Sequence, residues 1–245
     1  MPQVRIGTSG WHYQHWRGPY YPPSVSPRAM LEYYARDFDT VELNNSFYRL
    51  PSSTAFAAWK RSTPVGFCFA VKGSRYLTHR KKLLDPQPAL DRLMQATDGL
   101  GAKLGPILFQ LPPNWHCNPD RLAAFLRTLP SKTRFTIEFR DQSWHNRQVF
   151  QLLQEHNVAW CVYELGGIRS PIEVTADFVY VRLHGPGNKY QGDYSHQTLK
   201  SWVAHVDRWI KSDRDVYVYF DNDQAGYAVK NAQELKRMCD LTLRP

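Results

Sequence analysis

Two glutamates in this chain end apolar segments and can do acid–base chemistry. Glu42 ends the segment TVE, and Glu138 ends the segment RFTIE. Two carboxylates that face one pocket can act as acid and base, or as nucleophile and acid, in glycoside hydrolysis. Each can instead be the ion-pair partner of an arginine, since Arg140 lies two residues beyond Glu138 and Arg182 lies in a similar segment.

A divalent metal is a second chemistry that these residue types can support. His184 lies two residues after Arg182, on the same face of an extended segment. Together with carboxylates it offers the mixed nitrogen and oxygen donors of a metal site. The sequence has no HExxH spacing, and the alternative is a histidine that is hydrogen-bonded within the fold. The carboxylates considered with His184 are Glu42, Glu138, Asp221 and Asp223.

Cationic and aromatic side chains accompany these carboxylates. Lys72 ends another apolar segment and is followed by the basic run GSRYLTHRKKL. Such a run is often a solvated surface, but beside a site it attracts anions and contacts phosphates. Aromatic rings next to cations stack on bases or sugars, and amides bind hydroxyl groups. The residues predicted to bind a substrate are Trp11, Tyr13, Asn44, Tyr48, Lys72, Gln110, Arg140, Trp144, Arg182, Asn222 and Asp223.

The segments that end in these residues alternate with helical patterns. In RFTIEFR, Phe135, Ile137 and Phe139 fall on one face, whereas Glu138 and Arg140 fall on the other. Strands that are followed by helices indicate parallel βα units, in which both faces of the sheet are covered. Polar groups at the carboxyl ends of such strands are typical of the mouth of a βα barrel. We predict strands at 4–9, 40–44, 67–72, 106–111, 135–140, 158–163, 178–184 and 216–221.

Helical periodicity and cap signals occur between most of these strands. Ser26 and Asn118 each precede a proline at the first position of a predicted helix. The segment 164–174 shows no full helix, and long loops follow the first, third and seventh strands. Because one barrel takes about 250 residues, we predict a single α/β domain over residues 1–245, a (β/α)8 TIM-type barrel. The helices are predicted at about 27–35, 54–61, 88–100, 119–129, 146–156, 196–211 and 224–238.

The composition favours an anionic partner in the cytoplasm. The chain has 31 Lys and Arg residues against 22 Asp and Glu, a net charge of +9. This balance suits a small anion or a nucleic acid, although ordinary basic enzymes share it. The sequence has no signal-peptide pattern and no long apolar segment, so no membrane association is expected. Without a C-x-x-C motif, the cysteines are predicted to be buried free thiols; they are Cys68, Cys117, Cys161 and Cys239.

Six segments in a fixed order resemble a known family. They are GTSGW, TVELNNSFYRLP, LGPILFQLPP, EFRDQSW, YVRLHG and VYVYFDND. Together they are similar to the bacterial YecE-like family, known as domain of unknown function 72. The resemblance implies a TIM-type barrel and implies no activity. The chain departs from the family pattern at Asp141, where a histidine is common, and at Tyr163 and Glu164, where an aspartate often ends the strand.

Three functions are compatible with these residues. The first is a hydrolase acting on a phosphate- and ring-bearing substrate (nucleotide, nucleic acid or phosphosugar), with Glu42, Glu138 and His184 as catalytic residues. The second is a non-catalytic protein that binds nucleic acid or nucleotides. The third is a metal-free glycosidase that uses Glu42 and Glu138. The sequence leaves open the substrate, the presence of a metal and the oligomeric state.

Overall fold

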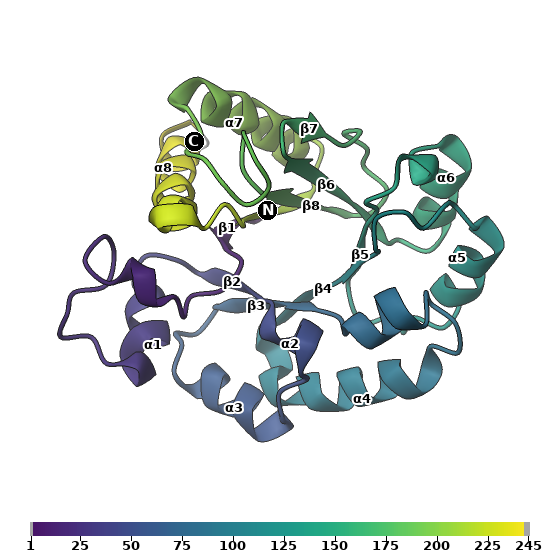
Figure 1. Ribbon diagram of the computed structural model, residues 1–245, viewed down its shortest axis with the longest axis horizontal. Coiled ribbons are helices and arrows are strands. Elements are labelled where there is room, and N and C mark those ends of the chain that lie inside the picture. Colours follow the sequence, from purple (N-terminus) through teal and green to yellow (C-terminus); the bar gives the residue numbers. More distant parts are fainter. Residues whose placement is uncertain (1, 243–245) are drawn as a thin grey trace.

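The computed structural model describes residues 2–242, and a barrel of eight parallel strands forms its centre (Figure 1). The barrel strands are β1 (Val4–Thr8), β2 (Thr40–Leu43), β3 (Cys68–Lys72), β4 (Leu104–Gln110), β5 (Phe135–Glu138), β6 (Ala159–Leu165), β8 (Phe178–Leu183) and β9 (Asp215–Phe220). They pair in the order β1, β9, β8, β6, β5, β4, β3 and β2. An isolated parallel bridge between Ser9 and Glu42 then connects β1 with β2, so the barrel is nearly closed. The predicted fold is therefore confirmed.

The two faces of each strand contribute to two different cores, as the alternation predicted. Phe135, Ile137 and Phe139 belong to a large apolar cluster that also contains residues of the surrounding helices. Residues of the opposite face, among them Tyr180 and Tyr219, form a smaller buried cluster with residues of neighbouring strands. Because both faces are covered, a polar side chain can reach solvent only at an end of the barrel.

Helices surround the barrel (Figure 1). Two cap predictions can be checked directly: the Asn118 side chain accepts a hydrogen bond from the Arg121 amide at 2.9 Å, whereas the Ser26 side chain makes no capping bond. The helix predicted after Ser26 begins as a 3-10 turn (Pro27–Ala29). The helices are α1 (Met30–Tyr34), α2 (Asn45–Tyr48), α3 (Ser53–Arg61), α4 (Gln87–Thr97), α5 (Pro119–Leu126), α6 (Arg147–Glu155), α7 (His196–Lys211) and α8 (Tyr227–Thr242).

Three connections determine the shape of the barrel mouth. The short helix α2 follows β2 directly and was not predicted, since one helical turn is too short to show a periodic pattern. The loop after β3 contains a π-helical turn (Tyr76–Arg80), where only an open loop was expected. After β6 the chain forms a short antiparallel strand, β7 (Ile168–Arg169), and no helix precedes β8, as predicted.

The four cysteines are free thiols. Cys68, Cys161 and Cys239 are buried as predicted, whereas the prediction was wrong for Cys117, which lies half-buried in the loop before α5. Across residues 2–242, no helix combines the length and the apolar character needed to cross a bilayer.

Candidate functional site at the mouth of the barrel

Arg182 is the centre of a charged network at the carboxyl ends of the strands. Its guanidinium contacts Glu42 from β2, with Nη2 and Nε at 2.7 and 2.9 Å from the two carboxylate oxygens. Nη1 donates to Glu138 of β5 at 2.8 Å, and Nη2 lies 3.1 Å from Asp221, just after β9. Arg182 and both glutamates are fully buried. Side chains from four strands or strand ends therefore meet at one guanidinium.

His184 connects this network to a second arginine. Arg140 forms an ion pair with Glu138, and its Nη2 lies 3.1 Å from His184 Nε2. Arg182 Nη1 lies 3.3 Å from the same nitrogen. Because guanidinium groups only donate, His184 Nε2 must accept, which places the proton on Nδ1. Nδ1 then donates this proton to Asp221 Oδ2 at 3.0 Å.

Glu42 is further held by neutral donors that the sequence reasoning missed. Tyr180 donates its hydroxyl to Glu42 at 2.7 Å, and Ser9 Oγ donates to the other oxygen of the same carboxylate. Tyr180 could have been found, since it lies two residues before Arg182 and shares its face of β8. No sequence signal pointed to Ser9, which reaches Glu42 because β1 and β2 meet where the barrel closes.

The arginines keep the carboxylates ionised despite their burial. Burial alone would raise the pKa of Glu138, but the charges of Arg140 and Arg182 hold it well below its usual value of 4.5. Burial would also raise the pKa of Asp221, and the hydrogen bond from His184 together with the charge of Arg182 lowers it. Both groups are therefore anions at neutral pH.

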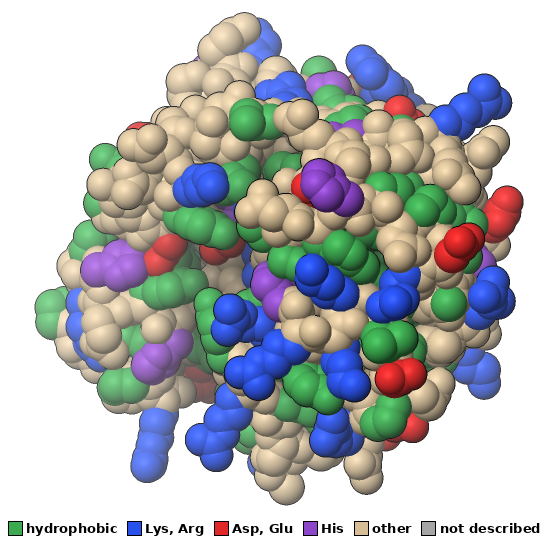
Figure 2. Space-filling view, turned by 45° about the vertical axis from the view of Figure 1, so that its right-hand side comes forward, with side chains coloured by type: hydrophobic (Ala, Val, Ile, Leu, Met, Phe, Trp, Pro, Cys, Tyr) green, Lys and Arg blue, Asp and Glu red, His purple; other side chains and the backbone are tan. Residues whose placement is uncertain are grey.

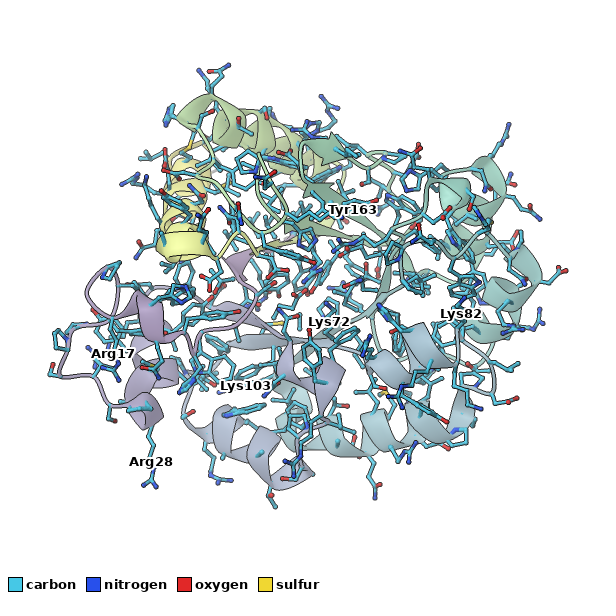
Figure 3. All side chains as sticks on the ribbon, viewed as in Figure 1. Arg17, Arg28, Lys72, Lys82, Lys103 and Tyr163 are labelled. Carbon is cyan, nitrogen blue, oxygen red and sulfur yellow. The ribbon has the colours of Figure 1, made fainter. Side chains whose placement is uncertain are left out.

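Lys72 differs from these paired residues. It ends β3, is 9% exposed and has no ion-pair or hydrogen-bond partner for its amine within residues 2–242. Its Nζ lies 4.5 Å from the centre of the Phe47 ring. Burial and the charge of Arg182 lower the pKa of Lys72 from 10.5 to about 8, against the opposing effect of nearby carboxylates. Figure 3 shows Lys72 near the middle of the barrel, with Tyr163 across from it.

A cavity of about 450 Å³ adjoins the mouth and is lined by residues of α2, of the loop after β3 and of α4. Ser46 connects the two, because it lines the cavity and donates a hydrogen bond to the Lys72 carbonyl at 2.7 Å. Figure 2 shows a hollow on one face of the molecule with Lys and Arg side chains gathered along one side. The cavity's charged and aromatic lining consists of Phe47, Tyr48, Arg75, Tyr76, Arg80 and Arg92. In the described part of the chain, none of these arginines has an ion-pair or hydrogen-bond partner for its side chain.

Comparison with known proteins identifies the family. The family model described as "Protein of unknown function DUF72" matches residues 5–244. The chain belongs to the DUF72 family. It is 25% identical to the UPF0759 protein YunF of Bacillus subtilis, over 97% of this chain and 95% of YunF. It is also 29% identical to the UPF0759 protein YecE of Escherichia coli K12, over 45% of this chain and 41% of YecE. The family resemblance inferred from the six segments is confirmed.

Solved structures of DUF72 proteins share this fold. A DUF72 protein from Thermotoga maritima (TM1631) superposes with a TM-score of 0.87 and 28% identity, covering 97% of this chain and 99% of its own. A DUF72 protein from Enterococcus faecalis (EF0366) has a TM-score of 0.81 at 18% identity, covering 99% of this chain and 98% of its own. These similarities support the barrel fold, and they assign no activity.

The residues at the mouth of this DUF72 barrel do not fit a metal site. Within residues 2–242, no three His, Cys, Asp or Glu side chains are grouped as metal ligands. His184 presents Nδ1 to Asp221 and Nε2 toward Glu138, at 3.0 and 3.5 Å, so the two carboxylates lie on different sides of the ring. Asp223 is turned toward Trp16 and His15. We therefore derive no chemical step through a metal.

The structure brings the predicted charged residues together but uses several predicted binding residues for packing. Trp144 is fully buried, and its indole donates to the Trp115 carbonyl at 2.6 Å. Asn222 is also buried and donates to the Gly192 carbonyl. In this conformation neither side chain can contact a ligand, because neighbouring loops cover both of them.

The remaining predicted binding residues differ in their exposure and contacts. Tyr13 donates its hydroxyl to the Ser9 carbonyl, and Trp11 packs edge-on against Trp59. Asn44 is half-buried and Gln110 is 8% exposed, whereas Tyr48 is 81% exposed on the cavity. A ligand can contact only those of these five side chains that keep an exposed edge.

The positions that depart from the family pattern have local roles. Asp141 accepts hydrogen bonds from Ser143 at the start of a 3-10 turn (Gln142–Trp144). Glu164 forms an ion pair with Arg169 of β7 at 2.9 Å. The Arg140 guanidinium lies over the Tyr163 ring, with its central carbon 5.4 Å from the ring centre. Of the three, Tyr163 alone contacts the charged network.

The network predicts a loss of stability in acid. Because the pKa values of Glu138 and Asp221 are lower in the folded protein, the unfolded chain binds protons more tightly. Their stabilising contribution is therefore complete above about pH 5 and is lost as the pH falls through the folded pKa values. Urea unfolding between pH 7 and pH 3 should show this decline, and Glu138→Gln should make it shallower. If the free energy of unfolding declines as steeply in the variant, the lowered pKa of Glu138 is not the cause of the acid effect.

Proposed function

We propose that this DUF72 protein binds a phosphate- and ring-bearing substrate at the mouth of its barrel and hydrolyses it. Nucleotides, nucleic acids and phosphosugars carry both features. The observation that carries the proposal is a set of neighbouring cations without ion-pair partners in the described residues, namely Lys72, Arg75, Arg80 and Arg92. Cations that are close together repel one another, and a bound anion relieves this repulsion.

The aromatic lining of the cavity supports a ring-bearing ligand. Tyr48 and Tyr76 are 81% and 45% exposed, which is unusual for large rings beside a cavity. Exposed rings next to guanidinium groups provide stacking surfaces for bases and sugars. Phe47 lies between the cavity and the mouth, because it lines the cavity and its ring faces Lys72. A ligand that places its ring on Tyr48 would thus extend its phosphate toward Lys72 and Arg140.

Hydrolysis would use the anionic groups of the network as a base. Glu138 is ionised, so it can accept a proton from an attacking water but cannot readily donate one. Its oxygens are occupied by Arg140 and Arg182. A substrate phosphate would compete for Arg140, free one oxygen of Glu138 and keep the cation beside the phosphate, where negative charge develops. Lys72 would stabilise the same charge.

A non-catalytic binding protein is the second candidate, and one observation favours it. Glu42, Glu138 and His184 are all fully buried and hydrogen-bonded, as expected for residues that only hold the barrel together. We do not propose the glycosidase. Its general acid needs a raised pKa, whereas Glu138 has a lowered one and Glu42 is held by Arg182, Tyr180 and Ser9.

The cavity arginines provide the test of ligand binding. We expect the chain to bind a short fluorescent single-stranded oligonucleotide or a mononucleotide, with an affinity that falls as salt rises. In Arg75→Gln/Arg92→Gln, affinity for the oligonucleotide should fall at least about tenfold and the slope of log K against log salt by roughly 0.7 per lost phosphate contact. Fluorescence anisotropy measures both quantities.

The matched control removes the same charge elsewhere. Arg28→Gln/Arg127→Gln changes two exposed arginines outside the cavity, and Figure 3 shows Arg28 at the far edge of the molecule. This variant should keep the affinity within about threefold, since distant surface charges are largely screened. A salt-independent affinity, or equal losses in the two double variants, would reject the proposed binding site.

A further inference from the structure

We propose that Lys72 is a nucleophilic amine that forms a reversible imine with a phosphorylated aldehyde or ketone bound at the mouth of the barrel. The inference rests on the proposed function in one respect, because it requires the mouth to bind an anionic substrate. It narrows the substrate class to phosphosugars in their open-chain carbonyl form. It also adds a covalent activity that hydrolysis does not need.

The position of Lys72 carries this inference. It is the last residue of β3, where barrel strands present their reactive groups. Every other charged side chain of the network has a partner: Arg182 and Arg140 bind carboxylates, and His184 binds Asp221. The Lys72 amine has none within residues 2–242, although the residue is only 9% exposed. An amine without a partner is free to react.

An imine-forming lysine must be a neutral amine before it reacts and a cation as the iminium, and the surroundings of Lys72 favour both forms. The nearby Arg182 guanidinium and burial favour the neutral amine, which is the nucleophile, and the pKa of Lys72 falls to about 8. At pH 7 this gives on the order of 100-fold more free amine than an ordinary lysine has. The carboxylates of Glu42, Asp221 and Glu138 lie close enough to act on the same group, and they would stabilise the iminium cation. The Phe47 ring faces the amine and adds a favourable contact for that cation.

The step is balanced without any further reagent. The Lys72 nitrogen donates its electron pair to the carbonyl carbon, the carbon–oxygen π bond breaks and the oxygen takes up a proton. The resulting carbinolamine loses this oxygen as water after a second protonation, while the nitrogen gives up one of its protons. Overall, one neutral amine, one carbonyl group and one proton give one iminium ion and one water. The phosphate of the substrate would lie toward Arg75, Arg80 and Arg92 in the adjoining cavity.

Reductive trapping tests the inference on the full chain. The protein is incubated with D-glyceraldehyde 3-phosphate and sodium cyanoborohydride, which reduces the iminium to a stable secondary amine. Peptide mapping by mass spectrometry should find Lys72 modified at least about tenfold more than the average surface lysine, given its larger fraction of free amine. Labelling should rise with pH up to about 8, where the free amine becomes the major form. Inorganic phosphate should compete with it.

Variants separate this inference from the proposed function. Lys72→Arg keeps a cation but has no nucleophilic amine, so it should lose the adduct at this position. Oligonucleotide binding by the wild-type protein reports on the anion site separately. Lys200→Arg, on the exposed face of α7, should leave labelling of Lys72 unchanged. Labelling of wild-type Lys72 no greater than that of other lysines would overturn the inference, whether or not the variant folds. If inorganic phosphate does not reduce the labelling and the wild-type protein binds no oligonucleotide, the anion site is rejected together with the phosphorylated substrate. Selective labelling of Lys72 would in that case still show a reactive amine.

Discussion

Replacing Arg182 by methionine should lower the free energy of unfolding by about 3–5 kcal/mol, the usual result of removing one partner of a buried ion pair. Arg182 is the shared cation of Glu42, Glu138 and Asp221. Without it, two fully buried carboxylates lose their strongest donors and must be protonated or hydrated. Urea unfolding at pH 7, followed by circular dichroism, measures the loss. The deficit should shrink as the pH is lowered, because protonation neutralises the orphaned carboxylates.

Two further variants test the physical reason for this loss. Glu42→Gln added to Arg182→Met should recover part of the stability, since it removes one of the uncompensated charges, with a coupling of about 0.5–3 kcal/mol. Arg134→Met is the matched control, because Arg134 pairs with Asp215 at 2.6 Å but its side chain is 35% exposed. That pair should contribute only about 0–1 kcal/mol. A similar loss in Arg134→Met and Arg182→Met would show that burial of the network has no special effect.

The sequence alone was enough to predict the barrel, because its alternation is local. The pattern that puts Phe135, Ile137 and Phe139 on one face and Glu138 on the other can be read within a single segment. Strand ends were harder to predict, since they depend on a partner. β6 extends to Leu165 because Glu164 and Leu165 pair with β7, which follows in the chain. Such pairings leave no local signature.

The site could be predicted as a set of residues but not as a set of contacts. The alternation placed Glu138, Arg182 and His184 toward the barrel interior. It could not show that Arg182, rather than Arg140 alone, would hold Glu42 and Glu138 together, because that depends on the register of β2, β5 and β8 across the barrel. Arg92 gave no signal, since it lies on the exposed face of α4 and reaches the cavity only through the path of the chain.

The variant Glu138→Gln should distinguish between the two proposed functions, a hydrolase and a non-catalytic binding protein. If Glu138 is the base, kcat for a phosphorylated substrate should fall by about 10²–10⁴-fold, because an amide cannot accept the proton. The affinity for the oligonucleotide or mononucleotide should change by less than about tenfold, since the cavity arginines remain. Turnover is measured as phosphate release from a panel of nucleotides, oligonucleotides and phosphosugars, at a temperature where the variant is folded.

Glu164→Gln is the control for this substitution, because it also removes a glutamate that ends a strand segment and pairs with an arginine. Glu164 lies on the opposite face of β6 from Tyr163, so its carboxylate points away from the mouth. Its loss should leave kcat unchanged within about twofold, as expected for a group that makes no contact with the transition state. Equal activity in Glu138→Gln and wild type would remove Glu138 from the chemistry. If no member of the panel is turned over while salt-dependent binding persists, the buried network has a structural role only and the DUF72 barrel is a binding protein.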